Sequence, residues 1–172
     1  MKLLKEKLES IFSSIKVSIL KQDRLIISTQ KDAVLSILSF LKDSGYTHLA
    51  LVSCVDWLEE KEFELVYVLS AYMQKDNAYT DKEKINIILK TRISRENPEF
   101  LTVISIFKNA EPYEREIHEF YGVDFKGHPR LTPLFLEREY KIPPFRKDFD
   151  TREYVKEVFD KIPFVENKDG KK

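Results

Sequence analysis

Two histidines and several acidic residues lie close together in the second half of the chain. His118 and His128 lie close in sequence to Glu114, Glu116 and Glu119. Two imidazoles and a carboxylate can bind Zn²⁺, Mn²⁺ or Fe²⁺, so one hypothesis is a metal-dependent hydrolase that uses His118, His128 and either Glu116 or Glu119. The spacing matches no closed metal motif such as His-Glu-x-x-His. The other interpretation, which we favour, is a set of solvated ion pairs on a helix.

A second cluster, Arg146-Lys147-Asp148-Phe149, has the composition of a protein interface. Arginine offers a rigid fork that binds a carboxylate through two hydrogen bonds, and phenylalanine supplies an apolar anchor. Arginine and aromatic residues contribute much of the binding energy at protein interfaces. Pro143 and Pro144 stiffen the preceding segment and reduce the entropy lost on docking. We therefore expect the cluster to bind another protein; a charged cluster in solvent is the alternative.

Other kinds of chemistry are excluded by composition. A single cysteine, Cys54, cannot form an internal disulfide, an iron–sulfur site or a zinc–thiolate site, and it lies in a segment that we expect to be a buried strand. Four scattered glycines form no phosphate-binding loop. Lys+Arg and Asp+Glu both number 29, which argues against nucleic-acid binding. No apolar run of about 18 residues predicts a membrane span, and the charged N-terminus predicts no signal peptide.

The helices and strands that we expect to position these residues indicate an α+β fold. Hydrophobic periodicity predicts a helix over 2–14 and a hairpin of strands 15–20 and 24–28. A second helix should start at a capping box formed by Thr29 and Asp32 and should stop near Gly45. Strands are then expected at 46–56, 62–72 and 84–93, with a long mobile loop over 74–83. Short connections imply a mostly antiparallel sheet with helices packed on one face.

The last predicted helix spans 112–121, with Pro112 in its first turn and Gly122 at its end. Glu111, Arg115 and Glu119 should pair along one side of it, because they are spaced four residues apart. Gly127-His128-Pro129 is then expected to form a turn.

The C-terminal part of the chain differs in composition from the rest. Five of the seven prolines lie after residue 128, and prolines disrupt both strands and helices. Because the same part is rich in leucine and phenylalanine, its side chains need a surface to cover. We therefore predict an α+β domain over 1–122 and an extended, proline-rich docking tail over 123–172.

Three motifs, in order, resemble the family of the complex I 30-kDa subunit. The first is Glu114-Arg115-Glu116 followed by Glu119, Phe120, Tyr121 and Gly122; the second is Gly127-His128-Pro129; the third is Pro144-Phe145-Arg146-Lys147-Asp148-Phe149. The strand segments 52–57 and 63–67 are also similar to the family. Pro112 stands where the family often has an aromatic residue, the segment 132–136 departs from the charged run common in NADH-linked members, and the chain is short. These departures favour the hydrogenase or sulfur-reductase branch, or another compact relative of complex I.

The resemblance implies a non-catalytic peripheral subunit of an ion-translocating oxidoreductase on the cytoplasmic side of the cell membrane. Such a subunit carries no redox centre. Its partners are a large subunit, which holds a Ni–Fe site or forms a quinone pocket, a small subunit with Fe–S clusters, and other subunits of the complex. We expect the tail to run over the large subunit, with Arg146, Lys147 and Phe149 as a clamp. The motif and interface residues are Glu114, Arg115, Glu116, Glu119, Phe120, Tyr121, Gly122, Gly127, His128, Pro129, Arg146, Lys147, Asp148 and Phe149.

Overall fold

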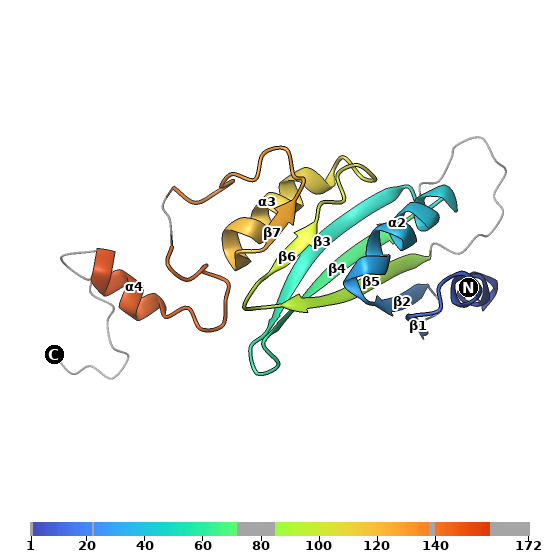
Figure 1. Ribbon diagram of the computed structural model, residues 1–172, viewed down its shortest axis with the longest axis horizontal. Helices are drawn as coiled ribbons and strands as arrows, with labels where there is room; N and C mark the ends of the chain where they lie inside the picture. The colour runs from blue at the N-terminus through green and yellow to red at the C-terminus, as the bar shows by residue number, and fades with distance from the viewer. Residues whose placement is uncertain (1, 22, 72–84, 138–139, 159–172) are drawn as a thin grey trace.

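The computed structural model describes residues 2–21, 23–71, 85–137 and 140–158. In chain order, the elements begin with α1 (Lys2–Ile11), β1 (Ile15–Lys21), β2 (Arg24–Thr29), a short 3-10 turn (Lys31–Ala33), α2 (Val34–Asp43), β3 (His48–Trp57), β4 (Glu62–Ser70), β5 (Asn86–Ser94) and β6 (Glu99–Leu101). They are followed by α3 (Ala110–Tyr121), β7 (Asp124–Lys126) and α4 (Thr151–Val158) (Figure 1). None of the helices in these described ranges is long and apolar enough to cross a bilayer.

Five strands form one mixed sheet in the order β1-β2-β5-β4-β3. The pairs β1–β2, β3–β4 and β4–β5 are antiparallel, as predicted for strands that follow each other directly in the chain. The central pair β2–β5 is parallel, which the sequence analysis did not anticipate. The fold is therefore α+β with a mixed sheet, and β6 and β7 form a separate parallel pair.

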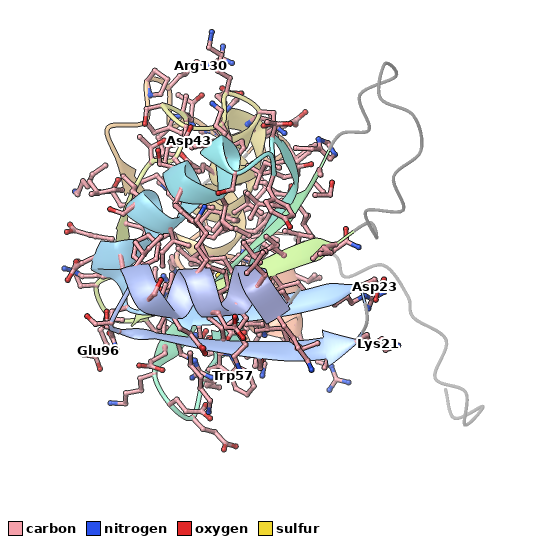
Figure 2. All side chains as sticks on the ribbon, turned by 90° about the vertical axis from the view of Figure 1, so that its right-hand side faces the viewer. Lys21, Asp23, Asp43, Trp57, Glu96 and Arg130 are labelled. Carbon is pink, nitrogen blue, oxygen red and sulfur yellow. The ribbon has the colours of Figure 1, made fainter. Side chains whose placement is uncertain are left out.

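One face of the sheet carries the hydrophobic core. In β4 the buried residues alternate with partly exposed ones: Phe63, Leu65, Tyr67 and Leu69 are buried. The same core includes Leu8 of α1, four residues of α2, and Ala110 and Ile117 of α3. Trp57 belongs to the other face, because it alternates with the buried residues Cys54 and Asp56. In Figure 2 Trp57 lies low in the view, at the end of β3, and Asp43, the last residue of α2, lies high.

The sequence predicts the C-terminal end of α2 correctly but not its N-terminal end. Gly45 has φ of +98°, and the amide of Tyr46 donates to Leu41 O, so the predicted glycine stop is confirmed. The predicted capping box is wrong. No side chain caps the 3-10 turn or α2, and the Thr29 hydroxyl is buried without a hydrogen-bond partner because Thr29 is still part of β2.

Beyond β7, the described residues up to 150 contain neither helix nor strand, and α4 follows. The sequence analysis predicted no helix there. In Figure 1, α4 lies apart from the sheet, at the opposite end of the molecule from α1. The division into a domain over 1–122 and a docking tail over 123–172 stays a prediction, and the loop expected over 74–83 lies outside the described residues.

Candidate interaction site

The first motif lies on α3, which ends as predicted: Gly122 adopts the left-handed conformation with φ of +78°. Glu114 faces the interior and is completely buried. Its carboxylate accepts hydrogen bonds from the Thr102 hydroxyl at 2.5 Å and from the Val103 amide at 2.7 Å. Burial raises the pKa of Glu114 to about 7, and the two hydrogen bonds oppose that rise. Glu114 therefore anchors the segment after β6 and belongs to no solvated ion pair.

Arg115 is also buried, and it binds the backbone of the proline-containing segment. Its Nε donates to Thr132 O at 2.9 Å, and one terminal nitrogen donates to Pro133 O at 2.8 Å. The predicted pairing along the helix is confirmed for Glu111, which lies 3.5 Å from Arg115. Arg115 thus fastens residues 132–133 to α3.

Glu119 continues this attachment one turn further along α3. Its carboxylate accepts hydrogen bonds from three successive backbone amides, those of Leu134, Phe135 and Leu136. A carboxylate that accepts several amides is a strong, directional anchor. Side chains of α3 therefore fix the path of residues 132–136.

The third motif crosses the end of α3 at Gly122. Arg146 Nε donates to Tyr121 O at 2.7 Å, and the guanidinium lies over the Phe63 ring at 5.2 Å. A Cβ on Gly122 would lie 2.9 Å from Arg146 Nη2 and 3.1 Å from Pro143 Cγ. Glycine is required here twice, for its positive φ and for the close approach of residues 143–146.

Asp56 fixes the same motif at the end of β3. This buried carboxylate accepts two hydrogen bonds from Arg95, at 2.8 and 3.2 Å, and one from the amide of Lys147 at 2.8 Å. Arg95 also binds Asp148 at 2.5 Å, and this contact lowers the pKa of Asp148. The sequence analysis missed Asp56 and Arg95 as site residues. The available signal was an acidic residue in a strand expected to be buried, because such a residue needs a partner.

The predicted clamp residues contact their own chain. Arg146 binds α3, the Lys147 amide binds Asp56, and the Phe149 ring packs against Tyr140 and Tyr154. Their contact with another protein stays a prediction. The described contacts show that this part of the chain folds back onto the domain.

The histidines do not form the metal site of the alternative hypothesis. His118 Nδ1 lies 2.9 Å from Val123 O, whereas His128 Nε2 lies 3.3 Å from Glu111 O and its Nδ1 accepts the Arg130 amide. Glu119 is engaged by backbone amides. In the described part of the chain no three His, Cys, Asp or Glu side chains are grouped to hold a metal ion. The hydrolase hypothesis is therefore not supported. His128 instead follows Gly127, whose φ of +83° confirms the predicted turn.

Three stacked phenylalanine rings lie at the surface, where the segments held by these contacts meet α3. Phe120 of α3 stacks on Phe145, with ring centroids 4.2 Å apart, and on Phe135 at 6.1 Å. Phe135 and Phe145 are 64% and 53% exposed. Beside Phe145 is a hollow of about 120 Å³ between β3 and α3, and it is lined by Leu51, Val52, Ser53, Cys54, Glu116, Ile117, Tyr121 and Phe145. The anchored backbone thus presents an apolar surface to the outside.

Residues 27–155 match the family model described as the respiratory-chain NADH dehydrogenase 30-kDa subunit. A subunit of the F420H2 dehydrogenase of Methanosarcina mazei is 36% identical over 129 residues, which is 74% of this chain and 76% of that protein. A subunit of the NADH-quinone oxidoreductase of Rhizobium rhizogenes is 29% identical, covering 82% of this chain and 68% of that protein. A chain in the solved structure of the membrane-bound sulfane sulfur reductase, an archaeal respiratory membrane complex, superposes with a TM-score of 0.81 at 29% identity. That match covers 98% of this chain and 96% of the other.

Proposed function

Because this chain belongs to the family of the 30-kDa subunit of respiratory-chain NADH dehydrogenase, we propose that it is a non-catalytic peripheral subunit of a membrane-bound oxidoreductase complex. Its role is to bind and position the large subunit of that complex. The relatives that support this proposal are subunits named for the enzymes to which they belong.

One structural observation carries the proposed role. The first motif holds residues 132–136 against α3, and the third motif is itself held at Tyr121 of α3 and Asp56 of β3. What they present outward is the stack of Phe120, Phe135 and Phe145, with two rings more than half exposed. Exposed aromatic residues on a rigid support are typical of protein interfaces. The motif residues therefore act by building a docking surface.

The branch of the family that we favour is the compact type represented by the sulfane sulfur reductase and the F420H2 dehydrogenase. The archaeal reductase chain matches over nearly the full length of both chains. The NADH-quinone oxidoreductase subunit is longer, and only 68% of it is covered. The electron donor and acceptor would bind to other subunits.

The proposal places the redox groups on the partner chains: Fe–S clusters on a small subunit, and a Ni–Fe, sulfur or quinone site on the large one. This chain would lie on the cytoplasmic side of the membrane and would be held there by its partners. Its zero formal net charge offers no electrostatic attraction to anionic lipid.

Purification from the native host tests this function. The chain, tagged at its N-terminus, should be recovered from detergent-solubilised membranes together with a large subunit and an Fe–S subunit. The isolated chain should contain no stoichiometric iron, whereas the complex should contain it. Recovery of the tagged chain alone, from the soluble fraction, would contradict the proposal.

A further inference from the structure

The hollow beside Phe145 has the features of a specific binding site for a protein side chain. Its lining includes Val52, Cys54 and Ile117, all of which are buried. Its volume of about 120 Å³ approaches that of an engineered apolar cavity, about 150 Å³, that accepts benzene. Leu51 and Phe145, at its rim, are 43% and 53% exposed. The hollow can therefore admit one apolar side chain, which would lie against Val52, Cys54 and Ile117 and beside the polar Ser53 and Glu116.

Glu116 is the only charged residue in the lining. The other glutamates of α3 are engaged: Glu111 by Arg115, Glu114 by Thr102 and Val103, and Glu119 by three amides. Glu116 has no hydrogen-bond or ion-pair partner among the residues that the structure describes. Because a partly buried carboxylate favours a nearby cation, we expect the group that binds beside Glu116 to carry a positive charge.

The hollow also lies beside β3, which is one of the two edge strands of the sheet. The edge is closed at its start, where Asn109 and Tyr113 donate to the carbonyls of Leu49 and Ala50. It is closed at its end by the contacts of Asp56 with Arg95 and Lys147. Between these ends α3 packs against the strand and leaves the hollow open beside residues 51–54.

We propose that the hollow between residues 51–54 of β3 and α3, with Glu116 and Phe145 beside it, binds a segment of a partner protein that carries an apolar side chain next to a lysine or arginine. The apolar side chain would enter the hollow, and the cation would pair with Glu116. This inference rests on the proposed function, which makes the partner another subunit of the complex. A second copy of this chain fits less well, because a two-fold interface brings identical patches together and this patch supplies an acid but no cation.

Photo-crosslinking in the assembled complex tests the location. Benzoylphenylalanine is placed at Leu51 and, as a matched control, at Ile19 of β1, which is 42% exposed at the opposite edge of the sheet. The Leu51 position should crosslink to a segment of another subunit in which an apolar residue adjoins Lys or Arg. No crosslink at Leu51, a crosslink to the same peptide as the Ile19 control, or a crosslink to this chain's own residues 159–172 would overturn the proposal.

Charge reversal tests the chemistry. Glu116→Lys should reduce the large subunit recovered with the tagged chain about tenfold, and Glu116→Gln about threefold, as estimated for a partly exposed ion pair. Glu59→Lys, an exposed change of the same charge in the turn after β3, is the control and should leave recovery unchanged. Replacing the partner's crosslinked cation with Glu should restore binding to Glu116→Lys. Equal losses for Glu116→Lys and Glu59→Lys, or no rescue, would overturn the proposed pairing.

The two proposals fail in different ways. If the wild-type chain is recovered with the membrane complex but Leu51 does not crosslink to it, only the site on β3 is wrong. If the wild-type chain is not recovered with any membrane complex, the proposed function itself is wrong.

Discussion

At the scale of single residues, Glu114 shows how one side chain of a motif can have a structural role. It lies on α3, and its partners Thr102 and Val103 lie in a segment outside the three motifs. Its carboxylate is buried and desolvated, yet two donors point at it. Burial outweighs the two hydrogen bonds and raises the pKa of Glu114 to about 7, so the charge of this side chain changes in the physiological pH range.

The raised pKa makes stability depend on pH. A carboxyl group that titrates near 7 when folded and near 4.5 when unfolded binds its proton more tightly in the folded protein. Its favourable contribution is complete below about pH 4.5 and is lost as the pH rises through 7. The free energy of unfolding should therefore fall by about 3 kcal/mol over this range. Urea denaturation at pH 5, 6, 7 and 8 measures how the free energy of unfolding changes with pH.

Two variants control this prediction. Glu114→Gln keeps an acceptor for the Val103 amide but cannot ionise, so it should flatten the slope. Thr102→Val removes a hydrogen bond that favours the charged form, so it should steepen the slope at neutral pH. A Gln variant with the wild-type slope would show that the pH dependence arises elsewhere.

At the scale of elements, α3 acts as the support on which the following irregular segment is laid. Arg115 and Glu119 bind carbonyls and amides of residues 132–136. An extended segment with no internal hydrogen-bond ladder needs such external partners for its polar backbone groups. Side chains of α3 thus supply the hydrogen-bond partners that a neighbouring strand supplies in a sheet.

Two glutamates on the same helix provide a matched comparison of this role. Glu119→Ala leaves three amides without their acceptor, and we expect it to destabilise the segment by about 1–3 kcal/mol. Glu116→Ala removes a carboxylate that has no partner among the described residues. Hydrogen exchange at the amides of Leu134, Phe135 and Leu136 should accelerate at least tenfold in Glu119→Ala and should not change in Glu116→Ala. Equal exchange rates in the two variants would contradict the anchoring role of Glu119.

The sequence predicted most elements of the sheet but not its order. Alternating residues and short connections were enough for the hairpins β1–β2 and β3–β4, and β4 and β5 were expected to pair as consecutive strands across a long loop. The parallel pair β2–β5 joins segments about 60 residues apart, and no local pattern encodes such a pairing. Helix α4 was missed because the prolines before it suggested that no regular element followed.

The sequence analysis named candidate site residues but did not predict which atoms they contact. The motifs named Arg146 and Glu119, but Arg146 was expected to contact a partner protein and Glu119 was expected to pair with Arg115 along the helix. Their actual partners, Tyr121 O and the amides of 134–136, are backbone atoms, and sequence patterns do not identify backbone partners at long range. Asp56 and Arg95 were missed for the same reason, because the three segments that meet there are distant along the chain.

At the scale of the whole molecule, the network of Asp56, Arg95, Lys147 and Asp148 joins the end of the sheet to the C-terminal part of the chain. Asp56 is buried, whereas the side chain of Asp148 is 40% exposed. The buried carboxylate should therefore contribute much more to stability, since its loss leaves Arg95 with a poorly compensated charge.

Comparison of the two aspartates tests this difference. Asp56→Asn should lower the free energy of unfolding by about 2–4 kcal/mol and expose residues 143–149 to proteolysis. Asp148→Asn should cost at most about 1 kcal/mol. Thermal unfolding and limited trypsin digestion measure the two effects. If both variants lose the same stability, Asp56 is not the anchor of this network.

The crossing of residues 143–146 over Gly122 also has a consequence for biosynthesis. The ring of Phe145 stacks on Phe120, and the contacts that hold it in place, of Arg146 with the end of α3 and of Lys147 with Asp56, are made by residues that follow it in the chain. A nascent chain on the ribosome therefore lacks the finished aromatic face until these late residues have emerged. Subunit assembly would then begin with completed chains, and truncated translation products would be left out of the complex.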